Sequence, residues 1–292
     1  MAAFTDWLNK FKTASSVWKL LIINIVVFLL LRLLGIIAMI GGWDIDNVVD
    51  ELALPSVPHL AAQRPWTILT YMFTHYAPFH LLFNMLALSW FGRLMTWRCS
   101  ERQMVWLYFY GGIAGAVFYF IAAQLFPGVG GWLLGASASV IAIVIATAFM
   151  MPDYPVMLLL FGNVKLKWIA VAAVILFGLG LVGDNAGAHV AHFGGIAMGA
   201  LFGYLINRGI DITRPASRAY DRITAFFRPS SPLSRKKFRP RKKQTKKTTT
   251  ITSEENDRRN LDAILDKIKH SGYTALTPDE RRQLFDISKR VK

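Results

Sequence analysis

Six apolar segments run through the first 207 residues, separated by short polar stretches. They lie at about residues 20–40, 79–95, 103–126, 135–151, 165–183 and 187–206. Each is long enough, or nearly so, to cross a bilayer as a helix. The fourth is short, and Gly128, Gly130 and Gly131 precede it, so we expect that helix to begin below the membrane surface, beside a water-filled cavity. The pattern predicts an all-α membrane protein built as a six-transmembrane-helix bundle.

Charge gives this bundle a direction. Lys and Arg precede the first span, separate the second from the third, open the fifth and follow the sixth, whereas the other loops hold mainly Asp and Glu. By the positive-inside rule both termini are cytoplasmic, and we expect a multi-pass protein of a bacterial plasma membrane. The net charge of +15 is concentrated after the last span, where 23 Lys/Arg face 10 Asp/Glu from Arg208 onward. Nucleic-acid binding by the whole chain is therefore not expected.

The sequence divides into four parts. Residues 1–16 form an amphipathic segment that lies on the membrane surface or packs on the protein's own cytosolic face. Residues 17–207 form the membrane domain. Residues 208–252 are a basic, disordered linker attracted to anionic lipids, with RNA contact as the weaker alternative. Residues 253–292 form a cytosolic helical hairpin, whose second helix opens at a capping box made by Thr277 and Glu280.

Two polar residues in apolar spans suggest chemistry. Ser137 lies in the first turn of the fourth predicted span, and His192 lies at a similar depth in the sixth. A lone serine in a membrane helix commonly bonds its own backbone. A serine beside a histidine is different, because a hydroxyl needs a neighbouring base to become a nucleophile at neutral pH. No carboxylate lies near either residue in a span, so the pair predicts a catalytic dyad.

The second span adds His80 and Asn84, which are four residues apart and share one helix face. An amide donor beside the nucleophile is suited to stabilising an oxyanion, together with the Ser137 backbone N–H. The alternative is that Asn84 bonds only a neighbouring helix. His75 and His189 are interpreted as structural, although His189 is a rival to His192 as the base.

Glycines follow His192 at helical spacing. Gly195, Gly199 and Gly203 are four residues apart, a ladder of small residues that lets a second membrane helix approach closely. Gly195 and Gly199 share a face with His192, so we expect the helix packed on the ladder to be pressed toward the imidazole.

These residues together resemble the rhomboid intramembrane serine proteases in their six-span, prokaryotic form. The matching elements are Trp66, His80 with Asn84, Gly135-x-Ser137, and Ala191-His192-x-x-Gly195-x-x-x-Gly199. The resemblance covers about residues 20–207. It implies that Ser137 is the nucleophile, that His192 is the general base and that His80 and Asn84 help to form the oxyanion site. It also implies single-span membrane substrates with helix-weakening residues, lateral entry between spans two and five, and no metal or cofactor.

The chain departs from this pattern at three positions. Ala138 replaces the last glycine of the Gly-x-Ser-Gly motif, and Ile141 replaces an aromatic residue that often packs on the imidazole. Thr67 stands where the family has the arginine of a Trp-Arg pair in the first outer loop, residues 42–78. These changes concern how the imidazole and the loop are held. Arg32, inside the first span, is expected to reach outward or to bond loop carbonyls.

Two alternatives remain. One is a catalytically silent rhomboid-like membrane chaperone or dislocation factor, a class that typically lacks the serine or the histidine. The other is a small transporter, which predicts inverted repeats that the sequence does not contain.

Overall fold

The structure is a computed structural model that describes residues 11, 13–126, 129–158, 162–182, 186–227, 262–269, 276–282 and 284. It consists of two compact units, Met1–Pro229 and Ser230–Lys292. Most of the predicted N-terminal segment, residues 1–10 and 12, lies outside the described residues, as do residues 228–252 of the predicted linker.

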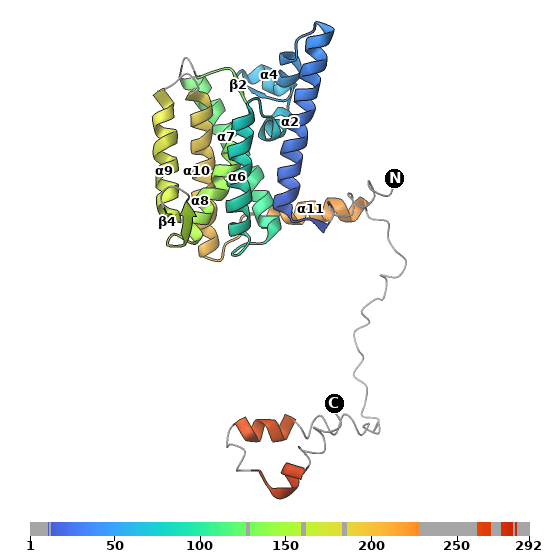
Figure 1. The fold of residues 1–292 in the computed structure, drawn as a ribbon, viewed down its shortest axis with the longest axis vertical. Helices are drawn as coiled ribbons and strands as arrows, with labels where there is room; N and C mark the ends of the chain where they lie inside the picture. Colours follow the sequence, from blue (N-terminus) through green and yellow to red (C-terminus); the bar gives the residue numbers. More distant parts are fainter. Residues whose placement is uncertain are drawn as a thin grey trace. The chain divides into compact units, whose positions relative to one another are not determined.

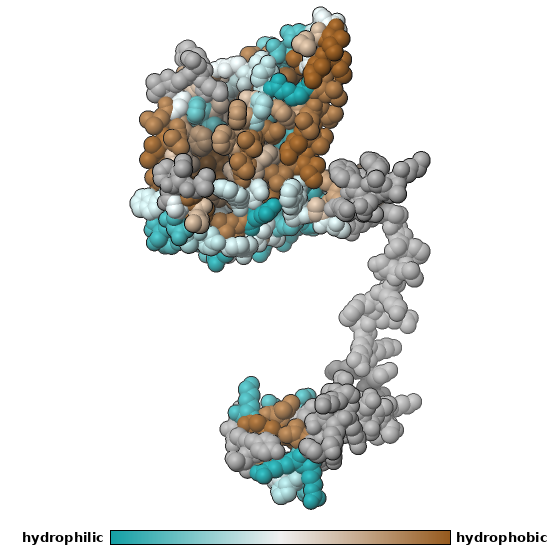
Figure 2. All heavy atoms as spheres, in the orientation of Figure 1, coloured by the Kyte–Doolittle hydropathy of each residue, from teal (hydrophilic) through white to brown (hydrophobic). Residues whose placement is uncertain are grey.

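The first unit is a bundle of membrane helices (Figure 1). Its principal helices are α2 (Ser16–Gly41), α6 (Pro78–Met95), α7 (Glu101–Leu125), α8 (Ser137–Met150), α9 (Leu166–Leu179) and α10 (Ala186–Asn207). The predicted all-α membrane class is confirmed. Among the described residues, α2, α7 and α10 are long and apolar enough to span a bilayer, while α8 and α9 are shorter apolar helices. On the face seen in Figure 2, an apolar belt crosses the helices and is bounded by a hydrophilic band at the end where β4 lies.

Helix α8 lies at the centre of the bundle. It packs against α6, α7, α9 and α10, and nearly all of its residues are buried. Its sequence is apolar on every side, which is the pattern of a helix surrounded by protein. The short length predicted for the fourth span is also observed, because α8 has 14 residues.

The glycine ladder of α10 packs on α8. A Cβ at Gly195 would collide with the carbonyl oxygen of Ala138, and one at Gly203 would lie 3.0 Å from the carbonyl oxygen of Ala146. Between them, Gly199 faces the backbone of Ala142. Only glycine permits this approach of two helix backbones. The helix that the sequence places on the ladder is therefore α8.

The segment between α2 and α6 contains short elements. These are α3 (Asp46–Asp50), β1 (Leu54–Pro55), α4 (Pro58–Gln63), α5 (Thr67–Thr70) and the 3₁₀ helix η1 (Tyr71–Phe73). Strand β1 pairs antiparallel with β2 (Trp132–Leu133), with Leu54 opposite Leu133. This pairing ties the first loop to the segment that leads into α8. At the other end of the bundle, β3 (Pro155–Leu158) pairs with β4 (Gly162–Lys165), which leads into α9. The 3₁₀ helix η2 (Gly180–Val182) follows the opposite end of α9.

The predicted linker is wrong over part of its length, because residues Arg214–Phe227 form helix α11. The high content of basic residues suggested disorder, but the apolar residues of this stretch recur at helical spacing. Asp211 fixes the start of the helix, since its carboxylate accepts hydrogen bonds from the backbone N–H and the hydroxyl of Thr213, at 2.8 and 2.6 Å.

The second unit contains two short helices, at residues 262–269 and 278–282. The capping box expected at Thr277 is present. The Thr277 backbone N–H donates to the Glu280 carboxylate at 2.8 Å, and the Glu280 N–H donates to the Thr277 hydroxyl at 3.3 Å. Lys267 donates to the same carboxylate at 2.8 Å, which links the two helices.

Acidification should loosen this link. Hydrogen bonds from Lys267 and from the Thr277 backbone hold the pKa of Glu280 at about 2, below its ordinary 4.5. A depressed pKa stabilises the folded state above the ordinary value, and the effect is lost as the pH falls toward 2. We expect amide exchange at 262–269 in the full chain, corrected for intrinsic rates, to accelerate over that range. Glu280→Gln should remove this pH response and the matched control Asp279→Asn should keep it; a response that persists in Glu280→Gln would contradict the assignment.

Candidate active site

Ser137 is the first residue of α8, and the backbone before it positions the hydroxyl. Gly135 has a φ of +116°, a conformation that residues with a Cβ rarely adopt. Its N–H donates to the carbonyl of Tyr71 at 2.9 Å, which fixes the turn against η1. A Cβ at Gly135 would also lie 2.5 Å from the His80 ring. The glycine two residues before Ser137 is therefore required by both backbone and space.

His192 lies on α10, which packs against α8, and it contacts Ser137 directly. The Nε2 atom of His192 is 2.7 Å from the Ser137 Oγ, a hydrogen-bond distance. The histidine is 8% exposed, and its Nδ1 atom has no hydrogen-bond partner among the described residues. The structure thus brings together the two residues that the sequence pairs, and no carboxylate of the described residues bonds the imidazole from behind.

The packing of α7, α8 and α10 sets this distance. Ala138 follows Ser137 and packs on Gly195, one turn beyond His192. On its other side the Ala138 methyl group faces α7, where a Cβ at Gly115 would lie 2.6 Å from it. The departure at Ala138 is therefore accommodated by a glycine on α7. Ser139 is also directed toward α7, because a Cβ at Gly112 would lie 2.7 Å from its hydroxyl.

A cluster of polar side chains lies beside Ser137. The Asn84 amide donates to the His80 carbonyl at 2.9 Å and lies 3.4 Å from His75 Nε2. The same nitrogen of His75 accepts the Ala136 backbone N–H at 3.3 Å. The His75 and His80 rings meet edge to face, 5.2 Å apart. His75, interpreted from the sequence as structural, is thus a direct partner of the turn that precedes the nucleophile.

Phe177 was not singled out in the sequence. It lies on α9, and its ring centroid is 4.1 Å from that of His192. The residue therefore supplies the aromatic contact that the resemblance places at position 141. No spacing within one helix identifies it, because the contact joins α9 to α10. His189 lies nearby, with its ring 5.5 Å from the His192 ring and 6.2 Å from the Phe177 ring.

Ser137 and His192 open into a cavity of about 290 Å³ between α6, α8, α9 and α10. Its lining combines the polar pair with apolar walls: His80, Phe83, Asn84, Ala87, Ser137, Val140, Ile141, Val144, Phe177 and His192. No group of three or more potential metal ligands occurs within the described part of the chain. The chemistry available in this cavity is that of a hydroxyl, an imidazole and amide donors.

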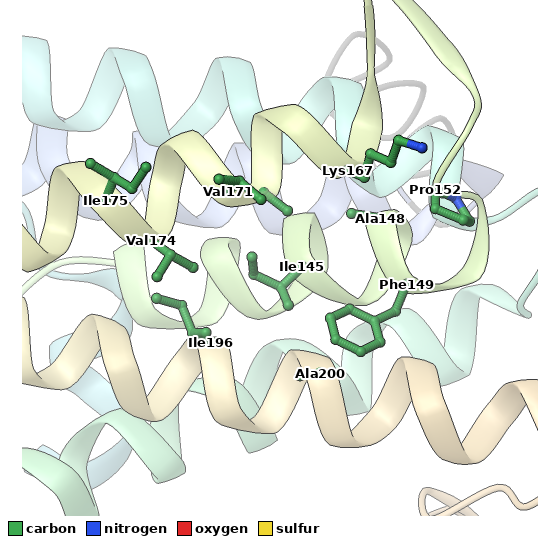
Figure 3. A pocket seen from close by; sticks show the side chains of 11 residues that line it. Ile145, Ala148, Phe149, Pro152, Lys167, Val171, Val174, Ile175, Ile196 and Ala200 are labelled. Carbon is green, nitrogen blue, oxygen red and sulfur yellow. The ribbon is translucent and has the colours of Figure 1, made fainter.

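A second cavity, of about 630 Å³, lies between α8, α9 and α10 (Figure 3). Side chains of all three helices face one another across it, with Lys167 at one end. Its other lining residues are apolar, including Ile145, Val171 and Ile196. The Lys167 ammonium donates to the Asp153 carboxylate at 2.9 Å, and the apolar lining residues supply no nucleophile or base, so the larger size of this cavity does not make it the reactive site.

Arg64 anchors the first loop, another role that the sequence did not reveal. Its guanidinium pairs with the Glu51 carboxylate at 2.7 Å and lies over the Trp132 ring. Trp66 donates its indole N–H to the Glu51 carbonyl at 2.8 Å. The family has an arginine directly after this tryptophan, whereas here Arg64, two residues before Trp66, supplies the positive charge. Arg32 was expected to reach outward or to bond loop carbonyls. It is exposed, and its guanidinium lies 5.2 and 5.1 Å from the ring centroids of Phe28 and Tyr76.

Two regions of the chain match known protein families. Residues 62–209 match the Rhomboid domain, and residues 252–290 match DUF6576, a family of unknown function. The chain is 27% identical over 195 residues to "Rhomboid protein 1, mitochondrial" of Saccharomyces cerevisiae, covering 64% of this chain and 55% of that protein. It is 27% identical over 225 residues to "RHOMBOID-like protein 12, mitochondrial" of Arabidopsis thaliana, covering 70% of this chain and 62% of that protein. The matched regions are thus less than two thirds of each relative's length.

Proposed function

Because the chain belongs to the rhomboid family, and is therefore an integral membrane protein, we propose that it is an intramembrane serine endopeptidase that cleaves single-span membrane proteins. The observation that supports this proposal best is the 2.7 Å contact between the Ser137 hydroxyl and His192 Nε2 inside an apolar bundle. A nucleophile and a base within hydrogen-bond reach are the minimum requirement for acyl transfer.

In this proposal the neutral imidazole carries its proton on Nδ1 and accepts the Ser137 proton on Nε2. The Ser137 oxygen attacks the scissile carbonyl carbon, and the developing oxyanion is stabilised by the Ser137 backbone N–H, Asn84 and His80. As the C–N bond breaks, His192 returns its proton to the leaving amine, which leaves an acyl-enzyme. Water then attacks the ester carbonyl while His192 accepts a proton from it. The bond between the carbonyl carbon and Ser137 Oγ breaks, His192 returns the proton to Oγ, and the carboxyl product leaves. No metal or cofactor takes part in these steps.

The cavity indicates how a substrate reaches the dyad. Phe83 of α6 and Phe177 of α9 both line it, so we propose lateral entry between these two helices. A peptide must expose its carbonyl to Ser137, and helix-weakening residues near the cut make that possible. In Figure 1, α9 lies at one edge of the bundle, on the side away from α2, and a helix at an edge moves with less repacking than a central one.

We propose that the protein lies in a bacterial plasma membrane with both termini in the cytoplasm. The distribution of Lys and Arg supports this orientation. The two relatives are named as mitochondrial proteins, and we do not transfer that location to this chain. Between residues 235 and 247, nine of thirteen residues are basic, and we propose that this stretch binds anionic lipid headgroups. A catalytically silent chaperone is the alternative, and the presence of both Ser137 and His192 disfavours it.

A fluorophosphonate probe tests the proposal. The purified protein should be labelled, mass spectrometry should locate the adduct on Ser137, and the same preparation in proteoliposomes should cleave a panel of single-span substrates. Absence of labelling in a folded protein, or an adduct on another serine, would favour the silent scaffold.

Phe177→Ala should slow labelling of Ser137 by about tenfold. The substitution removes the ring that holds the imidazole, and such aromatic contacts contribute about 0.5–1.5 kcal/mol. Phe177→Tyr should restore most of the rate, because it keeps the ring. Leu176→Ala is the matched control, since Leu176 is 66% exposed on the same helix. Equal rates for Phe177→Ala and the wild type would show that the ring does not position His192.

A further inference from the structure

Helix α11 has two sharply different faces. At 100° per residue, the apolar residues fall on one side and the charged residues on the other. The apolar face contains Ala216, Ala219, Tyr220, Ile223, Phe226 and Phe227, and the polar face contains Arg214, Ser217, Arg218, Asp221, Arg222 and Thr224. Such a division predicts a helix that buries one side.

The apolar face of α11 is uncovered. None of the residues of the helix is buried. Ile223 is 59% exposed, Phe226 is 84% exposed and Phe227 is 77% exposed. A row of large apolar side chains at this exposure is costly in water and is typical of a surface that binds another apolar phase.

Two polar contacts hold α11 against the start of α7. The Arg102 guanidinium donates to both carboxylate oxygens of Asp221, at 3.0 and 2.8 Å, and the Gln103 amide donates to Asp211 at 2.9 Å. The Arg102 guanidinium also lies 6.0 Å from the centroid of the Tyr220 ring, at the edge of the apolar face. This attachment leaves the other large apolar residues, Ile223, Phe226 and Phe227, exposed. The helix is fixed near the point where the apolar residues of α7 begin.

The position of α11 in the first unit identifies what covers its apolar face. Figure 1 shows α11 running across the direction of α2, beside the end of the bundle at which α2 begins. In Figure 2 the apolar belt gives way to hydrophilic residues toward this end. A helix with this orientation and this level lies where lipid headgroups meet acyl chains.

Charge identifies the lipid. Asp221 is paired with Arg102, and Arg214 lies 3.8 Å from the Asp211 carboxylate, so Arg218 and Arg222 are the arginines of the polar face that have no acidic partner among the described residues. Arg208 precedes the helix, and the basic stretch 235–247 follows it in the sequence. Basic residues beside a membrane each contribute roughly 1 kcal/mol of attraction to an anionic leaflet.

We propose that α11 is an in-plane membrane helix that binds the anionic phospholipids of the leaflet in which α2 begins. Ile223, Phe226 and Phe227 lie at the acyl boundary, and the arginines contact lipid phosphates. This inference concerns a folded helix fixed to α7 and does not depend on catalysis.

Cysteine labelling of the full chain tests the proposal, because the single native cysteine, Cys99, is buried. Phe226→Cys lies on the apolar face, and the matched control Ala225→Cys lies about 100° around the helix, among the polar residues. Both native residues are exposed. Each protein is labelled with an environment-sensitive fluorophore and reconstituted into phosphatidylcholine vesicles with and without phosphatidylglycerol. Brominated lipid should quench the label at position 226 at least about threefold more than at position 225. Phosphatidylglycerol should increase that difference, and replacing Arg214, Arg218 and Arg222 by Gln should remove the increase.

Three results would overturn the proposal. Equal quenching at the two positions would show that the apolar face is not in the bilayer. Protection of position 226 from both brominated lipid and aqueous iodide would indicate a protein partner, such as a second copy of this chain. Indifference of the quenching to phosphatidylglycerol would exclude an anionic-lipid site.

Discussion

Replacing His192 with alanine should lower the rate of peptide hydrolysis by about 10⁴- to 10⁶-fold while the protein remains folded. The Ser137 hydroxyl has His192 Nε2 as its hydrogen-bonding base, at 2.7 Å, and His192 Nδ1 has no acceptor behind it among the described residues. Without the imidazole the hydroxyl is a weak nucleophile and the leaving amine loses its proton donor. The rate is measured with a reconstituted single-span substrate, beside fluorophosphonate labelling.

The double variant sharpens this test. Two residues that act as one unit give non-additive losses, so Ser137→Ala, His192→Ala and the combination should be nearly equal in residual rate. Ser139→Ala is the matched control, because Ser139 lies on the same helix with its hydroxyl directed toward α7. If His189→Ala abolished the reaction and His192→Ala left it intact, the base would be the neighbouring histidine instead.

The sequence predicted the helical class and the pairing of Ser137 with His192 because both depend on periodicity and local motifs. Apolar segments of spanning length identify helices directly. The glycine ladder beyond His192 indicated that another helix approaches that face, and the structure identifies this helix as α8 through Ala138 and Ala142. The depth of a residue in the membrane follows from its distance along the chain from the end of its span, so the sequence alone placed Ser137 and His192 at a similar depth.

Contacts between elements distant in sequence were not predictable in this way. Phe177 meets His192 across two helices, and Arg64 replaces the missing loop arginine through a pair with Glu51. His75 binds the Ala136 N–H because η1 packs beside the turn before α8. In each case the identity of the residue was visible, but its partner was set by tertiary packing.

Helix α11 was missed for a different reason. Its arginines, within a strongly basic region, suggested disorder, although the apolar residues Tyr220, Ile223 and Phe226 recur at helical spacing. Charge content predicts disorder only where the chain has no apolar face to bury. The spacing of the apolar residues within 214–227 is by itself typical of an amphipathic helix.

The same substitution, glycine to alanine, should have opposite effects at two positions of the bundle. At Gly199 of α10 the new Cβ would collide with the backbone of Ala142, lying 2.9 Å from its Cα and 3.0 Å from its carbonyl carbon. Backbone atoms in a packed helix cannot move aside as a flexible side chain can. We expect Gly199→Ala to destabilise the protein by about 2–3 kcal/mol and to lower activity as well, since this contact sets the distance from α8 to His192.

Gly178 of α9 is the matched control. A Cβ there would meet only the end of the Phe193 ring, at 3.9 Å, which is ordinary van der Waals contact. Alanine has the higher helix propensity by about 1 kcal/mol, so Gly178→Ala should leave stability unchanged or raise it. Thermal unfolding of both variants in the same detergent gives the comparison. A wild-type melting temperature for Gly199→Ala would mean that α8 and α10 are not in backbone contact, and the register that brings Ser137 to His192 would then need another cause.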